Sequence, residues 1–508
     1  MFPLCNHSPA TLLNGKDIYE NLILESHILY RIAKEIDFSF VNEACRDLYS
    51  QDQGAPVKYL PEIMFRSAII QYLNDFSDRD MEDAARYHLA IKWFIGLPIE
   101  SCSFDHSALG DFRVRLGEER WNELFFMLLK QIEDAGFAKR AQNIDATHII
   151  ANIAIPGTIG LIRQAIKAIM NEIKLVNPEL FKELGGEKTA DKKEKIHLLK
   201  PEGKKKKLVE VVEEARMIKS KAQALESPSV NEKIEQLNRI LNENVEEKEG
   251  KIQKRKDHVE DKLVSCVDQD ARYGAKSDKK PFTGYKANMM TSDDGFVTNI
   301  LGSPGNTYDG NYLLPVVDEK CEKSSKPEKV CGDTHYGSEE NRYQMGLRGI
   351  KIVAPFRQDS KSNDPFSQDM FTIAKTGVTC PAGCRTIISN TNEKTGMITF
   401  YFKKEFCQHC VLKEACTKQD RRTITIGPHH DLIVEAKKYN ETQDFKDDMK
   451  ERAHIEPKHS EMKRNHGMVR ARYWGLSKLN IQLIITAITV NVKRFVNVVG
   501  SVCYLEKC

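Results

Sequence analysis

Apolar residues recur at intervals of three and four through residues 17–137, as in the run Ile69-Ile70-Gln-Tyr72-Leu73. This spacing is typical of amphipathic helices that bury one face. Ser77 is followed by acids and predicts a helix start, because serine caps free N–H groups and acids favour the first turn. A second helix is expected to start at Ser107. We therefore expect an all-α N-terminal domain over residues 1–137.

From about residue 139 the pattern changes to that of an extended strand. The run Ala141–Ile150 is rich in strand-forming residues, and Asp145 stands inside it among apolar neighbours. A carboxylate inside a mostly apolar strand is costly unless it binds a cation or meets a partner. Asp145 is therefore either a metal ligand or a capping or salt-bridged residue.

Residues 157–262 are highly charged and helix-prone, with sparse but partly periodic apolar residues. Such a segment is typical of a protruding helical hairpin, and we expect it to be an insertion in a core domain. The run Lys204–Lys207 within it is either a nucleic-acid contact or a solvated loop. The charges alone do not decide between these two interpretations.

Strand patterns return after this insertion. Two extended runs within residues 282–301 are separated by Ser-Asp-Asp, which is typical of a tight hairpin turn. A short strand then ends at Asp333, a helix is expected near Ser338, and another strand is expected at residues 350–355. Alternating strands and helices indicate an α/β sheet, in which ligands collect at strand ends. We expect residues 138–508 to form this second domain.

The composition is that of a soluble globular protein of several domains, with 508 residues, 41% hydrophobic residues and a net charge of +3. That charge is too small to imply a polyanionic partner by itself. Thirteen cysteines and no secretory signal pattern predict a reducing, cytoplasmic location. The apolar run Leu479–Val492 contains three amide side chains, so we expect a buried helix and no membrane span.

Residues 357–430 interrupt the α/β pattern and concentrate five cysteines within 37 residues. Four thiolates can form a closed tetrahedral zinc site that folds a small module. We therefore expect a cysteine-rich, zinc ribbon-like insertion with a structural Zn²⁺. The expected ligands are Cys380, Cys407, Cys410 and Cys416, with Cys384 as the substitute. The alternative is a set of free, partly buried thiols.

A dense group of cations surrounds Glu456 late in the chain. On a helix, Glu456 and Lys463 lie within about 20° of each other, and Arg452 lies about 40° away. Pro457 places Arg452 before the helix if it occupies the first turn. This arrangement suits a carboxylate that holds a metal beside cations that hold phosphates. A solvated helix face is the alternative, and Glu461 competes with Glu456 as the acid.

Further cations are candidates for DNA contacts. Arg464, Arg470 and Arg472 follow the acid, with aromatic residues among them. In the N-terminal region, Arg113 and Arg115 follow two short helices joined through residues 93–98, an arrangement similar to a helix-turn-helix reader. An ordinary helical bundle with solvated arginines is the alternative.

Asp145, Asp333 and Glu456 thus stand on a strand, a strand end and a late helix. Three carboxylates from separate elements can converge to hold two divalent metals, an arrangement that activates a water or hydroxyl for attack on a phosphodiester. Magnesium prefers oxygen ligands, so such a site suits Mg²⁺, or Mn²⁺ in its place.

With these motifs the chain resembles the DDE-type transposases of bacterial insertion sequences. The resemblance covers most of the chain and includes Ile144-Asp145-Ala-Thr-His148 and Gly332-Asp333-Thr-His-Tyr-Gly337. Its most specific motif is the family's Tyr, Arg, Glu and Lys signature, with two, three and six residues between members. Arg452, Glu456 and Lys463 fit that spacing, whereas Met449 occupies the tyrosine position.

The resemblance implies a ribonuclease H-like mixed sheet, with Asp145 on its first strand, Asp333 on its fourth and Glu456 on the final helix. It implies a two-metal enzyme that nicks the terminal inverted repeats of its element, as a homodimer on double-stranded DNA, and joins the freed 3′ hydroxyl to target DNA. Arg452 and Lys463 would contact the element end near the scissile phosphate. The alternatives are a silent DNA-binding relic and a ribonuclease H-like nuclease without strand transfer.

Overall fold

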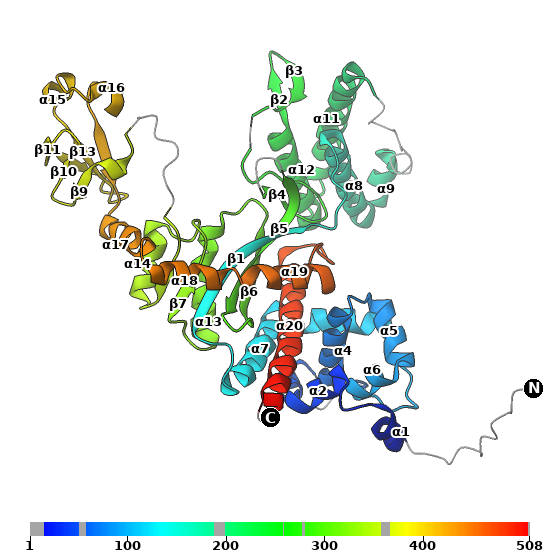
Figure 1. Cartoon of the computed structure of the whole chain (residues 1–508). Helices are drawn as coiled ribbons and strands as arrows, with labels where there is room; N and C mark the ends of the chain where they lie inside the picture. The colour runs from blue at the N-terminus through cyan, green and yellow to red at the C-terminus, as the bar shows by residue number, and fades with distance from the viewer. Residues whose placement is uncertain are drawn as a thin grey trace, which may run out of the picture.

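The computed structural model describes residues 15–49, 57–186, 199–257, 259–276, 280–356 and 366–505. It has a mixed α/β architecture with one curled mixed sheet and many helices (Figure 1). The first residues of the expected N-terminal domain, 1–14, and the start of the expected cysteine-rich insertion, 357–365, lie outside the described residues.

The N-terminal region is helical, as its apolar periodicity predicted. Ser77 caps α5 and forms a reciprocal capping box with Asp80. Helix α7 begins at His106 and is capped by Asp105, whose carboxylate accepts from the Ser107 backbone N–H, so the expected start at Ser107 was one residue late. The helices are α1 Gly15–Leu22, α2 Ile28–Glu35, α3 Phe40–Ala44, α4 Pro61–Leu73, α5 Asp78–Tyr87, α6 Leu89–Phe94 and α7 His106–Asp134.

The central sheet has the strand order β4-β5-β1-β7-β8, and β6 also pairs with β5. Strand β5 is antiparallel to β1, β4 and β6, whereas β7 is parallel to both β1 and β8. The expected hairpin is therefore present as β5 and β6. The strands are β1 Ala141–Ile150, β4 Arg272–Ala275, β5 Pro281–Ser292, β6 Val297–Pro304, β7 Lys329–Cys331 and β8 Lys351–Val353.

Helices cover both faces of this sheet. Apolar residues of α13, Leu313–Lys323, and α14, Glu339–Leu347, pack with Ile144 of β1 on one face. On the other face α20, Leu476–Leu505, packs against β6 and also against α2, α4 and α7. One hydrophobic core therefore runs from the N-terminal helices through α20 to the sheet, across the boundary expected at residue 137.

Helix α20 is long and apolar enough to cross a membrane by composition alone. However, 67% of its most apolar stretch is buried inside the protein. Its amide side chains are used internally, because Asn491 accepts from and donates to the backbone of Val297 on β6. These contacts make α20 a core helix of this fold, as the amide-interrupted pattern predicted.

The charged insertion forms a separate lobe between β1 and β4 (Figure 1). It contains more than a hairpin: α8 Thr158–Val176, α9 Pro178–Glu183, α11 Pro201–Gln223, α12 Pro228–Asn244 and the two-stranded β2–β3 sheet. Its sparse apolar residues, including Ile234, Leu237 and Ile240, gather in a hydrophobic core of their own. Strands β2, Val245–Lys248, and β3, Lys251–Lys254, lie next to α12 and α11.

The cysteine-rich insertion lies between β8 and α17. Its described part holds two three-stranded sheets and the short helices α15, Lys404–Gln408, and α16, Lys413–Cys416. The strands of the first sheet are β9 Thr372–Ala374, β10 Gly377–Thr379 and β11 Arg385–Thr386, and those of the second are β12 Ser389–Thr391, β13 Ile398–Tyr401 and β14 Thr423–Ile426. The chain then returns through α17, His430–Asn440, α18, Gln443–Arg452, and α19, Ile455–Asn465. Helix α18 contacts β1, β7 and β8, and α19 contacts β1.

Candidate active site

Asp145 and Asp333 lie side by side because of the register between two parallel strands. The ladder between β1 and β7 pairs Asn143 with Cys331. Continued two residues beyond the ladder, this register brings Asp145 of β1 near Asp333, which follows β7 after Gly332. The two carboxylates are close enough for Asp333 to contribute to the raised pKa of Asp145.

The Asp145 carboxylate is largely buried, with 20% of its side chain exposed. Its Oδ1 lies 3.4 Å from Nη2 of Arg452, and its Oδ2 lies 3.8 Å from Nδ1 of His459. Burial raises the pKa of Asp145 to about 6, and the nearby Asp333 adds to this effect while Arg452 opposes it. Burial, together with nearby cations, lowers the pKa of His459 to about 3, so this imidazole is neutral at physiological pH.

Asp333 is held by the turn that follows β7. Its Oδ1 accepts from the His335 backbone N–H at 2.8 Å, and its Oδ2 lies 3.2 Å from Nδ1 of His335. The next residue in the turn, Tyr336, is fully buried against Ile144 and Val330. The turn therefore fixes the backbone of Asp333 while leaving 31% of its side chain exposed.

A third acid at this site, Asp309, was not anticipated from the sequence. It begins a short 3-10 helix, and the Gly310 after it touches the Asp333 turn so closely that a Cβ there would lie 2.3 Å from the His335 carbonyl oxygen. Lys286 of β5 contacts Asp309, with 2.6 Å between Nζ and Oδ1. Asp309 also contributes to the raised pKa of Asp145. No strand or helix pattern marks Asp309 in the sequence, so only the folded loop reveals it.

Glu456 lies in the first turn of α19, at the joint with α18. It is exposed, and in the part of the chain that the structure describes its carboxylate has no hydrogen-bond or ion-pair partner. Lys463, two turns later on the same side of α19, approaches His148 of β1 closely enough to lower its pKa. The resemblance placed Glu456 on the final helix, whereas α20 follows α19.

The three predicted acids are not drawn together as tightly as bound ligands. Within the described ranges, the single group of three such side chains with donor atoms all within 4.8 Å is Glu82, Asp105 and His106. That group is structural, since Asp105 caps α7 and the His106 backbone donates to Glu82. Asp145 and Asp333 are close to each other, whereas the exposed Glu456 carboxylate is not grouped with them.

Glu461, the competing acid, has a different environment. It accepts hydrogen bonds from Lys458 at 2.8 Å and from Lys493 of α20 at 2.9 Å. The nearby His466 imidazole, with Nε2 3.9 Å from Glu461 Oε1, and the two lysines hold the pKa of Glu461 well below the usual range. This carboxylate therefore joins α19 to α20, and its oxygens are occupied by cations of the same chain.

The cations predicted to contact DNA fall into two groups. Arg113 is buried and paired with Asp78 at 2.7 Å, because α5 and α7 pack together, so its guanidinium does not face solvent. Arg472 is similarly engaged with Asp75 and the backbone of Phe76. Exposed cations are Arg115, which stacks on Tyr49, Arg464, and Arg470, which lies beside the end of β1.

A second cationic region lies directly beside β1. Burial and the neighbouring Lys276 lower the pKa of Lys463 to about 8. A lysine whose charged form is disfavoured by burial and by a neighbouring cation favours an anion beside it. Lys463 and Arg452 both act on His459, which lies 3.8 Å from Asp145, so these cations are close to that acid.

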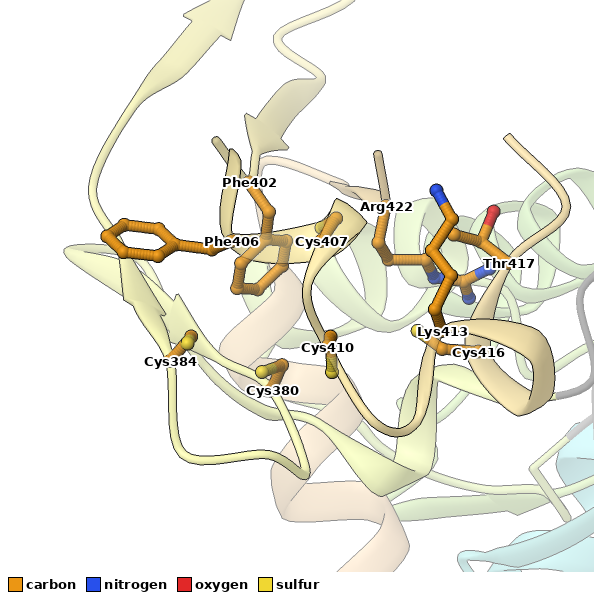
Figure 2. A pocket seen from close by; sticks show the side chains of 10 residues that line it. All are labelled: Cys380, Cys384, Phe402, Phe406, Cys407, Cys410, Lys413, Cys416, Thr417 and Arg422. Atoms are coloured by element: carbon orange, nitrogen blue, oxygen red, sulfur yellow. The ribbon is translucent and has the colours of Figure 1, made fainter. Parts of the chain in front are cut away.

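Five thiols meet in the cysteine-rich insertion (Figure 2). Burial and the thiols of Cys407, Cys380 and Cys410 raise the pKa of Cys416. The pKa of Cys384 is raised by burial and by the same three neighbours. The expected ligands Cys380, Cys407, Cys410 and Cys416 and the substitute Cys384 therefore share one site.

Two comparisons with known families place this geometry in context. A transposase domain (DUF772) matches residues 17–115, and a transposase DDE domain matches residues 379–496. The second match includes Glu456, Lys463 and the cysteine-rich insertion from Cys380 onward. No curated protein and no solved structure matches the chain significantly.

Both family matches are to transposase domains, and together they support an insertion-sequence DDE transposase, the family that the sequence motifs indicated.

Proposed function

We propose that the protein binds the ends of its insertion element and catalyses metal-dependent cleavage and strand transfer with Asp145, Asp333 and Glu456. The proximity of Asp145, inside β1, to Asp333, just beyond the parallel strand β7, carries this proposal. We add Asp309 to this set as a further carboxylate, which pairs with Lys286 and lies near Asp145. The unpartnered Glu456 completes the set from α19.

We further propose that residues 138–508 form a ribonuclease H-like catalytic domain, interrupted by the insertions at 157–262 and 357–430. When the strands of the central sheet other than the short β4 are numbered along the chain, β6, β5, β1, β7 and β8 give the order 3-2-1-4-5. Strand 2 is antiparallel to strand 1. Asp145 lies on the first of these strands and Asp333 follows the fourth. The helical region 1–137 would then contact the element end.

The acids fit a divalent metal such as Mg²⁺ or Mn²⁺. Asp145 is a buried carboxylate whose negative charge is opposed by Asp333 and Asp309, and a cation relieves that repulsion. Asp145, Asp333 and Glu456 would hold the two ions. Metal held there would supply activation of the attacking oxygen and stabilisation of the leaving oxygen of the phosphodiester.

The chain's own residues position the DNA around these acids. Arg452, 3.4 Å from Asp145, keeps that carboxylate in place and presents its charge near the scissile phosphate. Lys463 and Lys276 would hold a phosphate of the element end, because a bound anion offsets the burial and the repulsion from Lys276 that disfavour the charge of Lys463. His459 is neutral and buried, so it packs beside Asp145 without competing with the metal.

A further DNA contact is proposed on the helical insertion. A cleft of about 1110 Å³ lies between α8, α11 and the β2–β3 hairpin, and six lysines line it with a single acid, Glu213. The lysines are Lys204, Lys205, Lys206, Lys251, Lys254 and Lys256. This concentration of one charge favours a phosphate backbone, so we assign the Lys204–Lys207 run to nucleic-acid binding.

The test is incubation of the protein with Mg²⁺, labelled element ends and a target plasmid. Nicked ends and joined products are expected from the unchanged protein. An Asp333→Ala or Asp145→Asn protein is expected to bind the same ends without cutting them. Nicking retained by Asp333→Ala refutes the site, cutting without joined product supports the nuclease alternative, and binding without cutting supports the DNA-binding relic. Sedimentation of the DNA complex tests the expected homodimer.

A further inference from the structure

We propose that the cysteine-rich insertion is a structural zinc module in which Cys380, Cys407, Cys410 and Cys416 bind the ion and Cys384 is a spare thiol. This assignment is independent of the proposed chemistry at Asp145. The sequence left open both the presence of zinc and the identity of the ligands, and the folded arrangement of the thiols bears on both.

One tight backbone turn and two short helices bring the thiols together. Cys380 and Cys384 flank a turn in which the Cys380 N–H donates to the Cys384 carbonyl at 2.8 Å, and Gly383 adopts a φ of +81°. Cys407 is the last but one residue of α15, Cys410 follows that helix, and Cys416 ends α16. Three separate segments of chain therefore deliver cysteines to one place (Figure 2).

The thiols line a cavity of about 30 Å³, which is of the size of a single small ion or water. Its other lining residues are Phe402, Phe406, Lys413, Thr417 and Arg422, so it contains no carboxylate and no imidazole. His409, between Cys407 and Cys410, instead contacts the Glu405 carbonyl oxygen through Nδ1 at 2.9 Å. A donor set of sulfur alone selects zinc over magnesium or calcium.

The charge around the cavity also suits a tetrathiolate site. Zinc bound to four thiolates carries a net charge of −2, and the side chains of Lys413 and Arg422 line the same cavity. Lys413 Nζ donates to the carbonyl oxygens of Gln419 and Asp420 at 2.6 and 2.9 Å. The Arg422 guanidinium is close enough to Cys416 to act on its pKa, opposing the effect of burial in favour of the thiolate.

The module has too small a core to fold on hydrophobic packing alone. Its apolar cluster contains six buried residues, Phe371, Val378, Phe400, Phe402, Ile424 and Ile426. Small modules of this kind need a disulfide or metal crosslink. The ten cysteines whose side chains the structure describes are all free thiols. A metal is therefore the crosslink that remains.

The packing of the thiols selects four of the five. Cys380, Cys407 and Cys416 pack against the module's apolar core, and Cys410 belongs to the same knuckle as Cys407. Cys384 lies at the far end of the glycine turn and is not part of that packing. It is therefore the thiol that an ion with four ligands leaves unbound.

The site also stabilises the return of the chain toward the acids. Directly after the module, His429 stacks on Tyr343 of α14 with 3.6 Å between ring centroids, and its backbone N–H donates to Glu339 at 2.6 Å. Helix α14 begins just after Asp333. A folded module thus sets the point from which α17 and α18 run to Arg452.

The experiment is metal analysis of the purified full-length protein and of single cysteine variants. We expect about one zinc per chain in the unchanged protein, in Cys384→Ser and in the control Cys102→Ser, and a loss of zinc in Cys407→Ser and Cys416→Ser. Zinc absent from the unchanged protein after expression and dialysis with added zinc overturns the proposal. Zinc kept by Cys416→Ser but lost by Cys384→Ser overturns the ligand assignment.

A second measurement covers variants that fail to fold. Cobalt substituted into the unchanged protein is expected to show the visible absorption of a tetrahedral thiolate site, and that of Cys384→Ser should be the same. A spectrum of octahedral cobalt bound by oxygen contradicts the proposal. Nicking assays on Asp333→Ala test the catalytic proposal separately, because that variant is expected to keep its zinc.

Discussion

Glu461 and Glu456 lie five residues apart on α19, and the same substitution is expected to affect a different property of the protein at each position. In Glu461→Gln, the charge that holds Lys458 and Lys493 is lost, although the side chain keeps its shape. In Glu456→Gln, an exposed carboxylate with no partner among the described residues is neutralised. The first change should reduce stability, and the second should reduce cleavage.

The contacts of Glu461 give the expected size of the effect. It accepts two charge-assisted hydrogen bonds, at 2.8 and 2.9 Å, and its side chain is 24% exposed. Hydrogen bonds to charged groups contribute about 1.5–3 kcal/mol when buried and less when solvent screens them. We therefore expect Glu461→Gln to lower the free energy of unfolding by about 2 kcal/mol, or about 4–8 °C in melting temperature for a unit of 150–250 residues.

The effect should depend on pH with a defined sign. Because the folded pKa of Glu461 is depressed below the unfolded value of 4.5, its contribution is complete above that value and is lost as pH falls below it. The difference in melting temperature between Glu461→Gln and the unchanged protein should therefore be largest near neutral pH and shrink in acid. Thermal melts followed by circular dichroism at several pH values measure it.

Two results would refute this reasoning. Equal melting temperatures for Glu461→Gln and the unchanged protein at neutral pH would show that the carboxylate does not join α19 to α20. Loss of metal-dependent nicking by Glu461→Gln at a temperature where it is fully folded, with activity retained by Glu456→Gln, would exchange the roles of the two acids.

Three other changes test separate parts of the structure. Asp309→Asn should slow metal-dependent nicking without lowering affinity for element ends, and unchanged nicking would remove Asp309 from the site. Lys254→Glu should weaken DNA binding and reduce its dependence on salt, as measured by fluorescence anisotropy across a salt series, whereas an unchanged slope would exclude the lysine cleft. Lys320→Met leaves Glu133 without its buried partner at 3.0 Å and should lower the free energy of unfolding, measured in urea, by about 3 kcal/mol. Adding Glu133→Leu should restore much of that stability. Additive losses from the two changes would contradict the pairing.

Local patterns predicted much of the fold. The helix start at Ser77, the strand around Asp145 and the helix that begins after Ser338 all depend on residues close in sequence, and each was found where expected. The start of α7 was placed at Ser107 because serine is a common cap. Asp105 takes that position because its longer side chain reaches the Ser107 N–H.

Contacts between distant residues were not accessible from the sequence. Arg113 resembled a DNA-binding cation, but its partner Asp78 is 35 residues away, and the pairing exists only when α5 packs on α7. Asp309 likewise joins the acids through a loop contact with His335. The choice between Glu456 and Glu461 rested on helical spacing, and the structure adds the engagement of Glu461 by Lys493, 32 residues later.

The shared core has a consequence for how the protein is made. Helices α4 and α7 are complete by Asp134, yet the helix that covers their apolar surface begins at Leu476. During translation the apolar surface of these early helices stays exposed until α20 has left the ribosome. A chain cut short by a frameshift or early stop codon would keep that surface exposed and become a substrate for chaperones and proteases.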